Sequence, residues 1–196
     1  NYFTMDGLTF SLTADFTAAA DNSDALSVDV NRDYSPTVDS VKGLIKAYNE
    51  LVTKLNTYYT EEINYKYDPL TEEEEDAVTE KQAEELTGKA KSGILRNDAT
   101  IGSLLTNLRS AITVKVGDTG MSLQDLGITT VAWDSSKWKT EQGTLQLDEA
   151  KLQAALESDP NAVQNVLAAT GSTTVTGSGA DATSEAGFLT RIGSFM

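Results

Sequence analysis

The sequence predicts an α+β fold: a mainly helical, coiled-coil-like bundle with a small β-hairpin, preceded by a strand pair left from an adjoining β domain. Three patterns indicate this. An unbroken heptad repeat fills residues 36–59, capped amphipathic helices follow it, and strict apolar–polar alternation comes before it. We expect four segments: a β-domain remnant (1–35), a helical domain with a small hairpin (36–170), a flexible Ser/Thr/Gly linker (171–187) and the start of an amphipathic terminal helix (188–196).

The alternating stretch near the N-terminus predicts a β-hairpin. Residues 8–16 place apolar side chains at every second position, as a half-buried strand does, and residues 26–30 repeat the pattern after a loop. Asp6-Gly7 indicates a turn before the first of these strands. A lone hairpin is only marginally stable in water, and the sequence opens on Asn1. We therefore expect the chain to be a fragment whose other strands lie upstream, with residues 31–35 as the domain boundary.

The heptad stretch predicts one long helix that needs several partners. Its apolar residues are alternately three and four positions apart, and Leu44 and Leu51 at g positions widen the stripe beyond a two-stranded seam. Pro36 suits the first helical position and Ser35 is the expected N-cap. The predicted helix-packing seam consists of Val38, Val41, Leu44, Ile45, Tyr48, Leu51, Val52, Leu55 and Tyr59.

Two capping boxes predict short helices after the long one. Thr71 with Glu74 begins the first, and Thr79 with Gln82 begins a second that ends before Ser92-Gly93. Residues 61–90 hold eleven acidic residues and three lysines, so −8 of the net charge of −15 is local to this region. The acidic run 72–76 is most simply a solvated helix start, because contiguous carboxylates point in different directions and lack the alternation of a calcium loop.

The second half of the helical domain supplies partners for the long helix. Asp98 can cap a helix whose apolar stripe is the best such partner. Residues 128–133 and 144–147 predict the strands of the small hairpin, and two more helices, over 149–157 and from Pro160, follow. The partner stripe comprises Ile101, Leu104, Leu105, Leu108, Ala111 and Ile112.

The last residues have helical spacing and two interpretations. Segment 171–187 lacks periodicity and is rich in Gly, Ser and Thr, which is typical of a flexible linker. The apolar residues after it either pack into the chain's own core or contact a partner or another subunit. These candidate contact residues are Phe188, Leu189, Ile192, Phe195 and Met196.

Composition argues against most catalytic chemistry. The chain has no cysteine and no histidine, so thiolate zinc sites, cysteine nucleophiles and the commonest general base are excluded, and we expect no enzyme, no cofactor and no metal. The net charge of −15 opposes nucleic acid, and no apolar run is long enough for membrane insertion. A chain without cysteine suits an exported protein as well as a cytosolic one. Tyr65 and Tyr67 could form an aromatic binding surface.

Five motifs together resemble one known family. DGLTFSL, AYNELV, GILRNDATIGSLLTNLRSAI, SLQDLGITT and GTLQLDEAKLQAALESDPNAV occur in the order and spacing of the bacterial hook-associated protein 2 family, the flagellar filament cap proteins. They cover most of residues 6–167. The segment 69–93 resembles a version found in Gram-positive members.

The resemblance implies a structural role. Family members form a ring-like homo-oligomer at the distal tip of the extracellular flagellar filament, where they help exported flagellin subunits fold into place. The strand pair would belong to a head domain and the helices to a leg domain. Flagellin and other filament-tip subunits are the expected partners. Some members also bind mucus or host cells, so a surface adhesin for mucin or host cells, favoured by the tyrosines and the Ser/Thr-rich surface, is the alternative.

Overall fold

The computed structural model describes residues 2–5, 8–11 and 32–195, which fall into two units, 1–33 and 34–196. In the first unit, β1 (Tyr2–Met5) pairs antiparallel with β2 (Leu8–Ser11). The rings of Phe3 and Phe10 stack across this pair with their centroids 4.8 Å apart. The prediction missed β1, and its second strand, over 26–30, lies outside the described residues.

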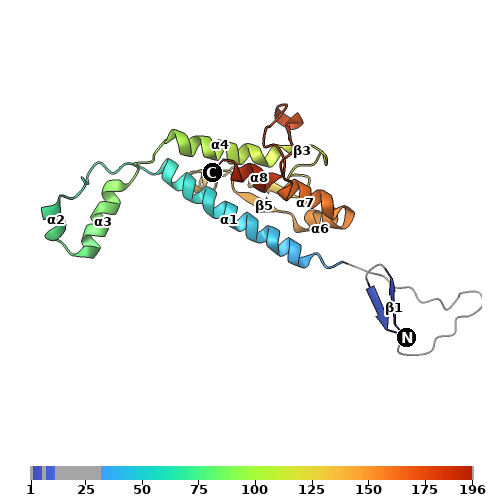
Figure 1. Cartoon of the computed structure of the whole chain (residues 1–196). Coiled ribbons are helices and arrows are strands. Elements are labelled where there is room, and N and C mark those ends of the chain that lie inside the picture. Colours follow the sequence, from blue (N-terminus) through green and yellow to red (C-terminus); the bar gives the residue numbers. More distant parts are fainter. Residues whose placement is uncertain (1, 6–7, 12–31, 196) are drawn as a thin grey trace, which may run out of the picture. The chain divides into compact units, whose positions relative to one another are not determined.

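The second unit begins with the long helix α1 (Ser35–Thr60), which runs along the bundle (Figure 1). Tyr34, and not Ser35, is its N-cap residue, so the predicted cap was one residue too late. Ser35 has helical geometry, and the Val38 N–H donates to the Tyr34 carbonyl at 3.0 Å. Pro36 lies in the first turn, where its fixed φ favours helix and its missing N–H is not needed.

Two short helices form an acidic arm after α1. Both predicted capping boxes are confirmed, at the starts of α2 (Glu72–Asp76) and α3 (Glu80–Lys91). The chain comes back from the arm to the end of α1 at Gly93, whose N–H donates to the Glu61 carboxylate at 3.0 Å. Gly93 has φ +72°, and a Cβ there would meet the backbone of Ile63 at 2.6 Å, so the return needs glycine.

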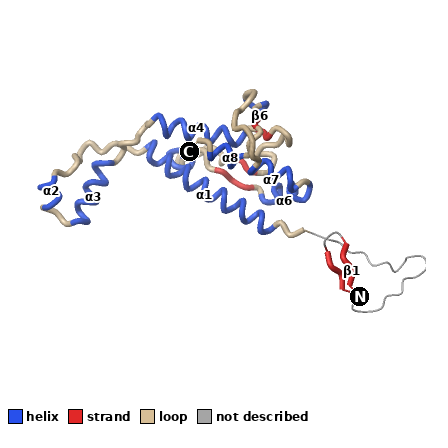
Figure 2. The backbone as a smooth tube through the Cα atoms, in the orientation of Figure 1, coloured by secondary structure: helices blue, strands red, loops and turns tan. Residues whose placement is uncertain are grey.

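Helix α4 (Ala99–Thr113) lies beside α1 and leads into the small hairpin (Figure 2). The Asp98 side chain accepts from the Ile101 N–H and caps α4 as predicted. Strands β4 (Ile128–Thr130) and β5 (Leu145–Leu147) pair antiparallel, which confirms the hairpin. Between them the chain makes the short helix α5 (Trp138–Glu141).

The remaining helices close the core. Asp148 caps α6 (Glu149–Ser158), and Asp159 caps α7 (Pro160–Ala168) by accepting from two backbone N–H groups. Helix α8 (Phe188–Gly193) packs on α4 and α7. The most deeply buried apolar side chains of this single core are Val52, Leu108, Ile112, Leu123, Leu126, Ile128, Leu152, Val163, Val166 and Phe188.

Segment 171–187 differs from the expected flexible linker. It contains a 3-10 turn (Gly179–Asp181) and β6 (Thr183–Ser184), which pairs in parallel with β3 (Lys115–Val116). Three small side chains in it are buried: Ala182, Ser184 and Ala186. Backbone hydrogen bonds and close packing of small residues hold this segment, and neither produces the apolar periodicity on which the prediction relied.

Across the described ranges, no helix is both long enough and apolar enough to cross a lipid bilayer.

Candidate functional site

The predicted seam faces the chain's own core. Its a and d positions from Val38 to Val52 are buried, and Leu55 and Tyr59 pack half-buried against the same core. The two g positions, Leu44 and Leu51, are half-buried. The stripe therefore joins α1 to α4, to the hairpin and to the C-terminal helices within one chain.

Tyr48 marks the centre of the seam. Its ring lies 5.9 Å from that of Phe188, centroid to centroid, and its hydroxyl faces the Leu108 carbonyl at 3.5 Å. Burial raises the pKa of Tyr48 to about 12, because the phenolate would lose its hydration. Tyr48 thus links α1, α4 and α8.

The terminal candidate residues divide between core and surface. Phe188 and Ile192 are buried and Phe195 packs half-buried on the core, whereas Leu189 is 43% exposed. Met196 lies outside the described residues. Of this set, Leu189 is the side chain best placed to meet another molecule.

Arg191, in the same helix, is 1% exposed and holds the C-terminal end of α4. Its guanidinium donates to the carbonyls of Ala111 (2.9 Å), Val114 (3.3 Å) and Ala186 (2.8 Å). Hydrogen bonds to these carbonyls stabilise the buried cation in place of a carboxylate, and Ala111 and Val114 lie at the C-terminal end of α4, the negative end of its dipole. This buried cation was not predicted from the sequence.

Leu44 and Leu189 line one apolar groove. The groove, of about 330 Å³, lies between α1, the end of α6, α7 and α8, and none of the described residues that line it is charged. Interface centres are typically depleted of charge. The structure thus brings one seam residue and one terminal candidate to the same surface. The lining is Thr37, Ser40, Val41, Leu44, Leu156, Pro160, Val163, Gln164, Leu167, Ala168 and Leu189.

A polar stripe on α1 holds the hairpin. Asn49 and Asn56 occupy successive e positions of the heptad. The Asn49 amide donates to the Leu145 carbonyl at 2.9 Å and accepts from its N–H at 2.7 Å, as a neighbouring strand would. Asn56 is 2% exposed and donates to the carbonyls of Thr140 (3.2 Å) and Gln142 (2.7 Å). These bonds fix β5 and the loop before it on α1.

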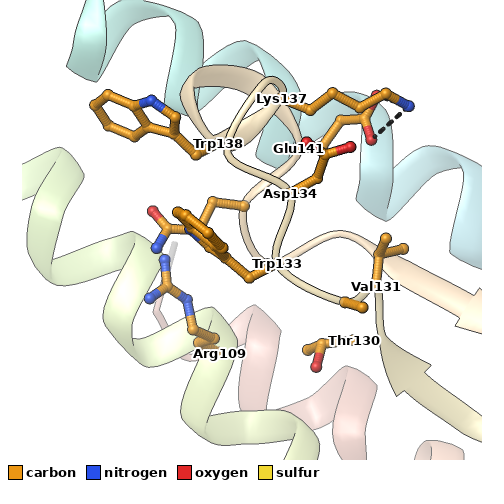
Figure 3. Close-up of a pocket in the computed structure, with 11 residues that line it drawn as sticks. Arg109, Thr130, Val131, Trp133, Asp134, Lys137, Trp138 and Glu141 are labelled. Atoms are coloured by element: carbon orange, nitrogen blue, oxygen red, sulfur yellow. Dashed lines mark hydrogen bonds and ion pairs between the residues drawn. The ribbon is translucent and has the colours of Figure 1, made fainter.

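That loop carries a second hollow, which we call the tryptophan pocket (Figure 3). It measures about 320 Å³ and lies between residues 130–143 and Arg109 of α4. Trp133 is 73% exposed and Trp138 is 43% exposed. In Figure 3 both indoles and the Arg109 side chain border the same hollow. Two exposed tryptophans on a loop fixed by hydrogen bonds form a candidate contact site.

Every charged side chain that lines this pocket, except Arg109, has an ion-pair or hydrogen-bond partner among the described residues. Lys137 and Glu141 form an ion pair at 3.3 Å. The Asp134 carboxylate accepts from the Ser136 hydroxyl (2.7 Å) and N–H (2.8 Å), and these bonds lower its pKa. Arg109 makes no ion pair or hydrogen bond with any described residue. The pocket was not predicted, although the sequence offered a signal: WDSSKWK places Trp133 three residues after the end of β4 and Trp138 seven residues before the start of β5.

The arm offers a weaker candidate. Tyr65 is 87% exposed, but Lys89 lies 5.2 Å from the centroid of the Tyr67 ring and covers it. The two tyrosines therefore do not present one open aromatic surface. No three acidic side chains of the described residues are arranged to hold a metal ion.

The fold and these surfaces define a class: a helical module that presents contact surfaces built on packed helices. A family model, Flagellar hook-associated protein 2 C-terminus, matches residues 1–196. The chain therefore belongs to the flagellar hook-associated protein 2 family, which confirms the resemblance seen in the motifs.

Individual relatives agree with the family model. The chain is 36% identical over 178 residues to the flagellar hook-associated protein 2 of Halalkalibacterium halodurans, covering 90% of this chain and 31% of that protein. It is 31% identical over 142 residues to that of Thermotoga maritima, covering 72% and 21%. It is also 28% identical over 157 residues to the B-type protein of Pseudomonas aeruginosa, covering 79% and 26%. The chain thus spans a third or less of these relatives. No solved structure matches it significantly.

Proposed function

We propose that this chain is part of a structural protein that caps the distal end of the bacterial flagellar filament and promotes the insertion of flagellin. The observation that carries the proposal is the match of the family model to all 196 residues. The relatives are named for the flagellar hook. In this proposal the protein is extracellular, forms a homo-oligomer when full-length, and has flagellin and other filament-tip subunits as partners.

The described surfaces are consistent with an assembly role. Polar side chains fix the loop of exposed tryptophans, and the groove at Leu44 and Leu189 is free of charged residues. Of the terminal residues, we retain Leu189 as a subunit or partner contact, because Phe188 and Ile192 are used inside the core. A net charge of −15 disfavours nucleic acid as a partner. No described feature specifically favours the adhesin alternative.

Immunogold labelling of intact cells with an antibody against this chain tests the proposal. Label confined to filament tips supports a cap. Label along the filament, over the envelope or only inside cells contradicts it, and label over the envelope together with mucin binding would favour an adhesin. In a strain without the gene, we expect flagellin in the medium and few or no filaments. Normal filaments in that strain would contradict the proposal.

A further inference from the structure

The outer edge of β4 opens into the tryptophan pocket. In the β4–β5 pair, Thr130 lies opposite Leu145, and the next pair is joined by a bond from the Val131 N–H to the Thr144 carbonyl at 2.8 Å. Bonded and non-bonded pairs alternate in antiparallel sheets. The N–H and carbonyl of Thr130 therefore point away from β5. Thr130 is exposed and lines the pocket.

The other edge of the same hairpin is already occupied. Asn49 satisfies both backbone groups of Leu145 on the α1 side. On β4 itself the outward N–H of Ile128 donates to the Leu123 carbonyl at 3.0 Å, so a further strand can be added to this two-stranded sheet only at the Thr130 end of β4. A free strand edge beside pockets for side chains is the arrangement by which extended peptides add to sheets, since the backbone bonds give affinity and the pockets give specificity.

The side chains of the tryptophan pocket, next to this edge, determine which kind of extended peptide segment can bind there. Trp133 and Trp138 offer indole surface for an apolar side chain. Arg109 is the one charged lining residue without a partner among the described residues, because Lys137 pairs with Glu141 and Asp134 accepts from Ser136. A guanidinium in this position fits a carboxylate, which it can bind with two parallel hydrogen bonds.

The pocket is also preorganised. Asn56 holds the carbonyls of Thr140 and Gln142, and the Thr60 hydroxyl donates to the Lys139 carbonyl at 3.1 Å. Gly143, at φ +84°, turns the chain back into β5; a Cβ there would lie 3.3 Å from Nε of Arg109. A contact surface held in place before binding loses less conformational entropy on association.

We propose that the tryptophan pocket binds an extended segment of flagellin that adds to the edge of β4 at Thr130. An acidic side chain of the segment pairs with Arg109, and an apolar side chain packs on Trp133 and Trp138. The choice of flagellin rests on the proposed function. The edge, the indoles and the free guanidinium define the segment: extended, with a carboxylate and an apolar side chain close together.

Binding of purified monomeric flagellin from the same bacterium to the full-length protein tests this. We expect Trp133→Ala to weaken binding at least about tenfold, as truncation of a central interface tryptophan does. Arg109→Gln should weaken binding several-fold and reduce its dependence on salt. The matched controls are Tyr65→Ala, an exposed aromatic on the arm, and Arg96→Gln, an exposed arginine, and both should bind within about twofold of the parent. Equal melting temperatures would show that the variants fold.

Three results would overturn the pocket proposal. The first is unchanged flagellin binding in both pocket variants. The second is loss of self-association with flagellin binding intact, which would make a second copy the occupant. The third is a parent protein that labels filament tips but does not bind flagellin monomers; the cap function would then stand and the assigned occupant would be wrong. Failure of the cap function itself is seen separately, as normal filaments in the strain without the gene.

Discussion

Two sides of α1 hold the second unit together by different means. The a and d side, from Val38 to Tyr59, buries apolar side chains against α4, the hairpin and α8. The e side uses Asn49 and Asn56 to bind the backbone of β5 and of the loop before it. Apolar burial stabilises the bundle without fixing any one backbone atom, whereas the amide bonds fix specific carbonyls.

The difference between the two sides explains why the loop between β4 and β5 can leave Trp133 and Trp138 exposed to solvent. An ordinary loop would bury its tryptophans to become ordered, but here the order comes from amides on α1, and both indoles stay exposed. The a and d side therefore determines mainly whether the unit folds. The e side determines mainly how the loop with Trp133 and Trp138 is held at the surface. Substitutions on each side should separate these two effects.

The largest effect is expected from Val52→Asp on the a and d side. An unpaired carboxylate at this fully buried position should lower the free energy of unfolding by about 3–5 kcal/mol and unfold the unit at moderate temperature. Ala47→Asp, on the exposed side of the same helix, should change it by less than about 1 kcal/mol. Thermal melting followed by circular dichroism measures both. Equal melting curves for parent and Val52→Asp would show that the seam is assigned wrongly.

The second-largest loss of stability is expected from Arg191→Met. The substitution keeps apolar bulk but leaves the carbonyls of Ala111, Val114 and Ala186 without their buried donor, at a cost of about 2–4 kcal/mol. Arg96→Met, at an exposed position, is the control and should be nearly neutral. Urea denaturation compares them. An equally stable Arg191→Met variant would mean that apolar burial alone holds α8, without the clamp on α4.

Asn56→Ala should disorder the loop between β4 and β5 without unfolding the rest of the unit. It leaves the carbonyls of Thr140 and Gln142 without a donor and should destabilise the unit by about 1–3 kcal/mol. Hydrogen exchange should become faster in residues 137–143, while amides on the buried face of α4 keep their order of protection. Thr57→Ala, one position further and exposed, serves as the control. Uniformly faster exchange throughout the unit would contradict a local role for Asn56.

Sequence reasoning recovered the features that are encoded locally. The heptad fixed the length of α1 to within two residues, the capping boxes at Thr71 and Thr79 placed α2 and α3, and the short strand-like runs after Gly127 and Gly143 placed the small hairpin. Each signal lies within one turn or one strand of the element it predicts. The N-cap of α1 was missed by one residue, since Ser35 and Tyr34 differ only in backbone geometry there.

Features that depend on contacts between distant residues were not predicted. Strand β6 pairs with β3 across almost seventy residues, and nothing in the composition of 171–187 distinguishes a packed segment of small residues from a linker. Asn56 looks like an ordinary surface residue in a heptad until its partners, more than eighty residues away, are known. Arg191 was missed for the same reason, since its partners Ala111 and Val114 lie 80 and 77 residues away.

Tyr48, on the apolar side, should make stability depend on alkaline pH. Burial raises its pKa to about 12 from about 10 in the unfolded chain, so its contribution is fully present below pH 10 and is lost as the pH rises towards 12. The loss amounts to about 2 kcal/mol, as an order of magnitude. Tyr48→Phe cannot ionise, so its unfolding free energy should fall less than that of the parent between pH 10 and 12 in urea titrations. Parallel pH profiles would mean that water reaches the hydroxyl.

The smallest effect is expected on the arm, where charge is dense but burial is slight. Glu73→Gln with Glu74→Gln should leave the melting temperature unchanged within error, because both side chains are exposed. The Glu74 carboxylate accepts from the Thr71 N–H at 2.9 Å, and a glutamine oxygen can accept the same bond, so the capping box survives. Glu74→Leu is the contrasting variant: it removes the acceptor and should fray the start of α2 without affecting the core. A large loss of stability in the double glutamine variant would show that these carboxylates bind something that the fold needs.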